Sequence, residues 1–174
     1  MQTEVLKKHH LNSENHKVEC TWSIDHDSVL VEFTVYNYIN PNINPSFSQD
    51  YKENWGLWEH DVVEIFIKKE GTSYLELQVS PLTQPFALII EKPRLEFNPP
   101  TMLNTHFSCV KNKDWKAVFK IPLSDIPGSG NKLYGNFFSC LGSDTRSYYA
   151  LNINSEDAPD FHRPELFVEL GDIE

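Results

Sequence analysis

Apolar and polar residues alternate along most of this chain, and the apolar positions are rich in β-branched and aromatic side chains. Such period-two runs predict β-strands, because successive side chains of a strand point to opposite faces of a sheet. Segments with helical periodicity are almost missing. The pattern predicts strands at residues 18–24, 29–36, 61–68, 74–80, 86–91, 106–111, 115–121, 132–141 and 165–170.

Turn-forming residues separate these runs. The segments 25–28 and 70–73 follow the first and third predicted strands and have turn chemistry, which predicts antiparallel hairpins. Prolines mark further connections, and no helix-length crossover lies between the strands. We therefore predict an all-β fold, an antiparallel two-sheet β-sandwich of the jelly-roll or immunoglobulin-like type. We expect a single domain over residues 1–174, with residues 1–16 as a poorly structured or peripheral N-terminal segment.

Composition and charge narrow the classes of partner. The chain has 174 residues and a formal net charge of -10, which disfavours nucleic acid and anionic lipid as partners. The longest apolar run, residues 86–90, is too short for membrane insertion. Three widely spaced cysteines predict no disulfide framework and leave one bridge open. Without an apolar signal region at the N-terminus, we expect a cytoplasmic protein by default, or an extracytoplasmic one if a leader has been removed.

The segment 54–67 is the most informative part of the sequence. Trp55 and Trp58 stand immediately before a predicted strand, together with several acids. Trp58 either caps the core or offers a flat apolar face to a ligand, while Trp55 suits a partner surface or a loop anchor. Glu64 lies between apolar strand residues, so it is either paired with an internal cation or in contact with a ligand.

The order of residues in 58–67, a tryptophan and an acid before the run D-x-V-E-x-F, resembles the family 9-like carbohydrate-binding modules, a branch of the DOMON-like β-sandwiches. Four further pieces agree in order. These are residues 25–31, residues 74–81, residues 115–123, and residues 135–138 followed by 159–167. The resemblance covers nearly the whole chain and implies the same sandwich fold.

The resemblance also implies a function: a non-catalytic module that takes the end of a glycan between two aromatic rings. It carries over Trp58 as one stacking wall and Glu64 as an acceptor of sugar hydrogen bonds. On the next strand Gln78 is a second polar contact, and by period two it shares its face with Glu76. The alternative is a DOMON-like small-molecule or protein-interaction domain that has lost sugar binding.

One departure from the family concerns the second wall, commonly a tryptophan before a proline. At this place the chain reads R-S-Y-Y-A-L-N over residues 146–152. The missing ring then has to come from Tyr148, Tyr149 or Trp55. Arg146 is a further candidate, as a contact to a sugar hydroxyl or as a group stacked on a ring.

Catalysis and cofactors receive little support from the sequence. Glu64 and Glu76 could form a glycosidase-like carboxyl pair, but no nucleophile elbow, HExxH or phosphate loop is present, so we expect a non-enzyme. We expect no cofactor. Acids at 25–27 and 59–61 offer oxygens to a structural calcium ion, and Met102 with His106 would be the candidates for haem ligands. In the closing loop, His162 and Arg163 either tie down the last strand or reach a ligand.

Overall fold

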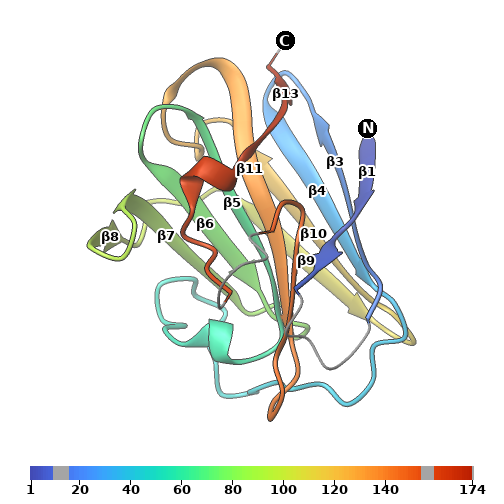
Figure 1. The fold of residues 1–174 in the computed structure, drawn as a ribbon. Helices are drawn as coiled ribbons and strands as arrows, with labels where there is room; N and C mark the ends of the chain where they lie inside the picture. The colour runs from blue at the N-terminus through green and yellow to red at the C-terminus, as the bar shows by residue number, and fades with distance from the viewer. Residues whose placement is uncertain (10–15, 154–158, 174) are drawn as a thin grey trace.

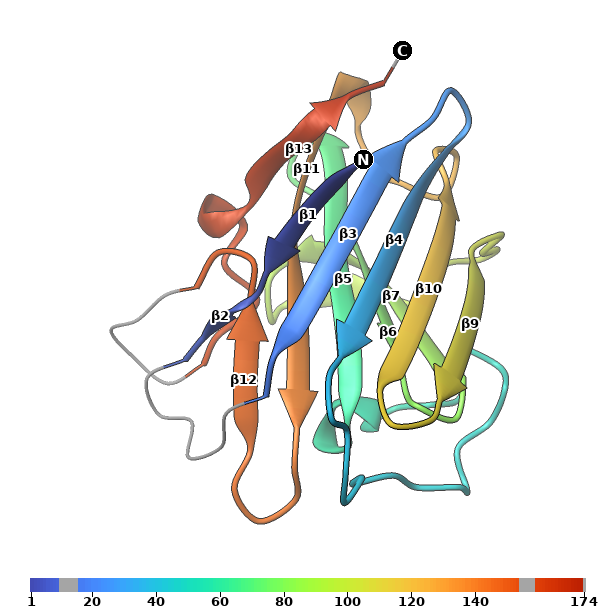
Figure 2. The same ribbon diagram turned by 90° about the vertical axis from the view of Figure 1, so that its right-hand side faces the viewer.

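Two antiparallel sheets pack face to face in the computed structural model, which describes residues 1–9, 16–153 and 159–173. Figure 2 shows the five-stranded sheet in front of β5 and β11 of the other sheet. Its order is β1 (Gln2–Val5), β3 (Val18–Ile24), β4 (Ser28–Val35), β10 (Trp115–Pro122) and β9 (His106–Lys111). We call it sheet A.

The second sheet, sheet B, has eight strands within the described residues. Its order is β2 (Lys7–Lys8), β12 (Ser147–Ala150), β11 (Ser129–Leu141), β5 (Val62–Glu70), β6 (Tyr74–Val79), β7 (Pro85–Lys92) and β8 (Glu96–Asn98), and β13 (Val168–Asp172) also pairs with β11. The described chain contains no α-helix, only the 3-10 turns η1 (Leu57–Glu59) and η2 (Pro164–Leu166). No helix in these ranges is long and apolar enough to span a membrane. The predicted two-sheet antiparallel sandwich is therefore confirmed.

Each predicted strand has a counterpart, and both predicted hairpins are antiparallel. The last strand begins three residues later than predicted, because residues 164–166 form η2 first. Four strands were missed: β1, β2, β8 and β12. They are two to four residues long, too short for an alternating pattern to stand out. Residues 1–9 are thus peripheral strands rather than irregular chain, while residues 10–15 of the predicted N-terminal segment lie outside the described residues.

The main core lies between the two sheets. Phe33 and Phe137 face each other across it, with ring centroids 6.1 Å apart and nearly perpendicular planes. Trp22 and Trp115 are buried in the same cluster, as their alternation with apolar strand residues predicts. The three cysteines are free thiols, so the one bridge left open by the sequence is absent.

Sheet B also buries its outer face, the face turned away from sheet A. On β5 the side chains of Val63, Ile65 and Ile67 enter the main core, whereas Val62 and Phe66 belong to a second apolar cluster. Two chain segments cover this outer face. One is the loop that contains η1 and precedes β5, and the other is the stretch that leads into η2 near the C-terminus. The second segment crosses in front of the sheet in Figure 1. Glu64 of β5 therefore has apolar surroundings on a covered face.

Candidate functional site

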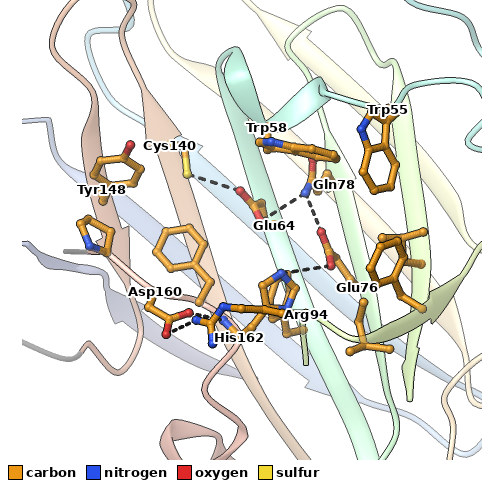
Figure 3. Close-up of a pocket in the computed structure, with 16 residues that line it drawn as sticks. Trp55, Trp58, Glu64, Glu76, Gln78, Arg94, Cys140, Tyr148, Asp160 and His162 are labelled. Atoms are coloured by element: carbon orange, nitrogen blue, oxygen red, sulfur yellow. Dashed lines mark hydrogen bonds and ion pairs between the residues drawn. The ribbon is translucent and has the colours of Figure 1, made fainter. Parts of the chain in front are cut away.

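A cavity of about 520 Å³ opens on the covered outer face of sheet B. Its floor consists of side chains from β5, β6, β7 and β11, and loops before β5, after β7 and before η2 provide the rim (Figure 3). The floor is apolar at Phe66, Leu88 and Ile90. A volume of this size fits a small organic ligand, and mostly apolar walls with a few placed polar groups are typical of such sites.

Three polar side chains stand on the floor of the cavity: Glu64, Glu76 and Gln78. Strand register places Glu64 directly opposite Gln78, and Glu76 precedes Gln78 by two residues, so all three share one face. The Gln78 Nε2 atom donates to Glu76 Oε1 at 2.7 Å and to Glu64 Oε2 at 3.4 Å. One amide nitrogen thus joins the two carboxyl groups (Figure 3).

Burial makes both carboxyl groups hard to ionise. It raises the pKa of Glu64 to about 7, although a hydrogen bond from the Cys140 thiol, 3.3 Å from Glu64 Oε1, and the charge of Arg146 act in the opposite direction. Burial raises the pKa of Glu76 to about 8, and the neighbouring Glu64 charge adds to this shift. Near neutral pH the pair therefore retains a proton.

Two buried acceptor atoms on the floor lack a partner. Glu76 Oε2 and Gln78 Oε1 have no hydrogen bond from any part of the chain that the structure describes. Their nearest cationic candidate is His162, whose Nε2 atom lies 3.9 Å from Glu76 Oε2. A buried polar atom without a partner destabilises the fold by about 1–3 kcal/mol. A ligand that brings hydrogen-bond donors would remove this penalty.

Two tryptophans form one wall of the cavity. Trp58 is half-buried beside the floor glutamates, and Trp55 meets it edge to face with ring centroids 4.9 Å apart. Trp55 is 60% exposed and also stacks on Phe97 of β8, 5.7 Å away. Gly56, between the two tryptophans, has a φ of 89°, a left-handed conformation that glycine adopts without strain. This residue therefore allows the sharp turn that orients both rings.

Arg146 holds this wall in place from outside the cavity. Its guanidinium donates to the carbonyl oxygens of Trp58, Glu59, His60 and Gly142 at 2.7–3.0 Å. Arg146 is not among the residues that line the cavity. The structure thus places it as a support of the η1 turn, and not at the position expected for a sugar contact.

The opposite side of the cavity comes from the loop before η2 and the turn after β7. Phe161 stacks on Phe138 of β11 with ring centroids 4.1 Å apart, and Arg94 forms an ion pair with Asp160. The Tyr74 hydroxyl and His162 Nδ1 are 2.6 Å apart. Burial, together with the charge of Arg94, lowers the pKa of His162. In Figure 3 Arg94, Asp160 and His162 lie across the floor glutamates from Trp58.

Among the predicted ligand contacts, Trp55, Trp58, Glu64 and Gln78 meet at the cavity. Tyr149 does not. It is 1% exposed in the main core, where its hydroxyl accepts a hydrogen bond from the backbone of His16. Its neighbour Tyr148, which pairs with Cys140 in the strand register, lines the cavity instead. Because consecutive strand residues point to opposite faces, only one of the two tyrosines considered for the second ring reaches the cavity.

Sequence reasoning missed several residues of the far wall. Arg94 and Phe97 belong to a turn and a three-residue strand that have no pattern of their own. For His162 both options, tying down the last strand and reaching a ligand, stay predictions: its ring contacts Tyr74 of β6 and it lines the cavity. Glu76 was identifiable, since period two places it beside Gln78.

The cofactor predictions stay predictions. Within residues 1–9, 16–153 and 159–173, no group of three or more His, Cys, Asp or Glu side chains could hold a metal ion. Met102, one of the two residues considered for haem, is 72% exposed and does not line the cavity, and neither does His106.

The fold of the chain is that of the family 9 carbohydrate-binding modules. A family 9 module from Caldicellulosiruptor kristjanssonii has been solved with glucose and with cellotriose. In both cases the TM-score is 0.61 at 16% identity over 94% of this chain, which covers 82% and 80% of the solved chains. A protein from Bacteroides uniformis, provisionally assigned as carbohydrate-binding, has a TM-score of 0.75 at 16% identity, over 96% of this chain and 84% of its own.

No family model matches the sequence. A zebrafish (Danio rerio) protein, the UPF0462 protein C4orf33 homolog, is 28% identical over 123 residues. The match covers 66% of this chain and 61% of the zebrafish protein. The similarity to the solved structures defines the fold.

Proposed function

We propose that this chain binds a monosaccharide or the end of an oligosaccharide in the cavity on sheet B, without catalysing a reaction. The observation that carries the proposal is the pair of unpartnered acceptors, Glu76 Oε2 and Gln78 Oε1, on a buried floor beside Trp58. Sugar hydroxyls are donors that such acceptors lack. Support also comes from similar structures that hold glucose and cellotriose.

A pyranose matches this cavity because it has two chemically different sides. Its C–H face would lie against the Trp58 ring, and its hydroxyls would donate to Glu64, Glu76 and Gln78. Tyr148 is the tyrosine of the 146–152 segment that reaches the cavity, so it is our candidate for a second ring. The proposed ligand therefore contacts residues from several strands and one loop at once.

Binding without catalysis follows from the position of Gln78. A glycosidase places its two carboxyl groups on either side of the scissile bond, with space between them for the sugar carbon. Here the Gln78 amide nitrogen donates to both carboxyl groups. The glutamates are thus arranged as acceptors on a floor rather than as an acid and a nucleophile across a bond.

Isothermal titration calorimetry with glucose, cellobiose, cellotriose and other mono- and oligosaccharides tests the proposal. We expect saturable binding by the wild-type protein and an affinity at least about tenfold lower for Trp58→Ala, because the stacking face is lost. Val110→Ala is the control, since Val110 is exposed on β9 of the other sheet and should leave binding unchanged. If no sugar binds, or if Trp58→Ala binds as well as the wild type, the proposal is wrong.

A further inference from the structure

We propose that the preferred ligand carries an ammonium group, so that the cavity selects an amino sugar with a free amine over a neutral sugar. This inference deepens the proposed function and rests on it. It depends on the balance of charges and of hydrogen-bond donors around the floor of the cavity.

The first observation is that the cavity has two acids and little to neutralise them. Within the described residues, no lysine or arginine nitrogen lies within 4.0 Å of Glu64 or Glu76. Arg94 is engaged by Asp160, and the Arg146 guanidinium is used by four backbone carbonyls outside the cavity. His162 approaches Glu76 to 3.9 Å, but burial disfavours its charged form. A cation from the ligand would complete this site.

The second observation concerns donors. Glu76 and Gln78 are 3% and 1% exposed, and each presents one acceptor without a partner in the described chain. An ammonium group has three donors and no acceptor, so a single –NH₃⁺ can satisfy both atoms and still reach Glu64. A hydroxyl has one hydrogen to donate and satisfies only one of them. The floor therefore matches an amine more fully than it matches a hydroxyl.

The wall adds a third contribution. Trp58 lies beside the same three floor residues in Figure 3, and the face of a tryptophan attracts a desolvated cation within about 6 Å of its centroid. Carboxylates below and an indole to one side make an environment suited to an ammonium group. A neutral sugar would gain the stacking contact and the hydrogen bonds of its hydroxyls, but it has no positive charge for the ring face or the carboxylates to attract.

Binding of an ammonium ligand should release a proton from the protein. When the ligand arrives, the O–H bond of a protonated floor carboxyl breaks, its proton passes to the buffer, and the carboxylate pairs with the ammonium. Glu64 faces the Cys140 thiol, the Gln78 amide and the charge of Arg146, whereas Glu76 faces Glu64 and His162. Proton release is therefore expected at pH 7, where the pair still holds a proton.

The groups beyond His162 affect this titration as well. His162 is held by the Tyr74 hydroxyl and feels the charges of Arg94 and Asp160. Because burial and Arg94 both disfavour its protonated form, it is a poor source of positive charge for the floor at pH 7. Protons released at that pH thus come mainly from the glutamates.

The test is calorimetry of the full chain at pH 7 with glucosamine, N-acetylglucosamine, glucose and ethanolamine, in two buffers with different ionisation enthalpies. We expect glucosamine to bind at least tenfold more tightly than N-acetylglucosamine or glucose, and its apparent enthalpy to change with the buffer as protons are released. In Glu76→Gln, the preference for glucosamine and the proton release should both decrease sharply. Glu32→Gln, which changes a glutamate on sheet A, should retain both.

The other outcomes separate the two proposals. If glucose binds as tightly as glucosamine, the ammonium inference is wrong and sugar binding stands. If ethanolamine, which has no sugar ring, binds as tightly as glucosamine, the sugar proposal is wrong and this inference falls with it. If none of the four compounds binds, the ammonium inference is wrong, and the sugar proposal is wrong as well if cellobiose and cellotriose also fail to bind.

Discussion

Glu76→Gln is expected to stabilise the protein at neutral and alkaline pH. Burial in the folded state raises the pKa of Glu76 from its ordinary value of 4.5 to about 8, so the folded chain binds more protons than the unfolded chain between these two pH values. Stability must therefore fall as the pH rises through this window, because ionising the buried carboxyl favours the unfolded state. Glutamine has nearly the same shape and has no charge to bury.

The pKa values set the magnitude of the effect. A pH of 7 is more than two units above the pKa of an ordinary glutamate, whereas folded Glu76 is still mostly protonated at this pH. This difference lowers the free energy of unfolding by about 3 kcal/mol. For a domain of this length, removing this penalty with Glu76→Gln should raise the melting temperature by about 6–12 °C. At pH 5, only half a pH unit above the ordinary pKa of a glutamate, keeping Glu76 protonated costs little, so the variant should differ from the wild type by less than about 1 kcal/mol.

Urea unfolding monitored by circular dichroism at pH 5, 6, 7 and 8 measures this difference directly. The advantage of Glu76→Gln should grow with pH, and a smaller pH dependence should remain in the variant because the pKa of Glu64 is also raised, to about 7. Glu32→Gln, a half-exposed glutamate paired with Lys116, should follow the wild-type curve. An advantage for Glu76→Gln that is the same at pH 5 and pH 8 would refute this reasoning.

Three further perturbations test how the site is built, each measured by urea unfolding. Arg146→Ala should lower the free energy of unfolding by about 3 kcal/mol, since four backbone carbonyls lose a charged donor. The control Arg94→Ala breaks the ion pair with Asp160 and should change the free energy of unfolding by less than about 1 kcal/mol. Equal effects of the two substitutions would contradict the supporting role of Arg146. Gly56→Ala should lower the free energy of unfolding by about 1–2 kcal/mol, because alanine is strained at a φ of 89°. No atom lies within 4 Å of an added Cβ, so a steric clash should not contribute. Unchanged stability would show that the turn is not strained. Tyr149→Ala should lower the free energy of unfolding by about 3–5 kcal/mol, because Tyr149 is buried in the main core, and Tyr148→Ala should lower it by less than half of that. The reverse order would mean that β12 presents its other face to the core.

The sequence was sufficient for the fold because its signals were local and repeated. Long alternating runs fixed the principal strands, and turn residues at 25–28 and 70–73 fixed two hairpins. The floor of the site was predictable for the same reason, since Glu64 and Gln78 lie on long strands whose two faces are unambiguous. Period two then places Glu76 on the same face.

The walls of the site could not be predicted in this way. In Ser147-Tyr148-Tyr149-Ala150 both tyrosines suit either face, so the four residues do not indicate which of the two is buried. Arg146 finds three of its partners among carbonyl oxygens more than 80 residues earlier in the chain, and a backbone carbonyl carries no sequence signature. Arg94 and His162 meet the cavity through turns whose course depends on tertiary packing.

The double burial of sheet B has a consequence for how the proposed binding site could change. The three polar floor residues stand on β5 and β6, central strands with neighbours on both sides and packing on both faces. The rings and charges around them come from loops, whose substitutions leave those strands intact. Relatives with the same floor could thus evolve toward different ligands by exchanging loop residues, while their acceptor geometry stays constant.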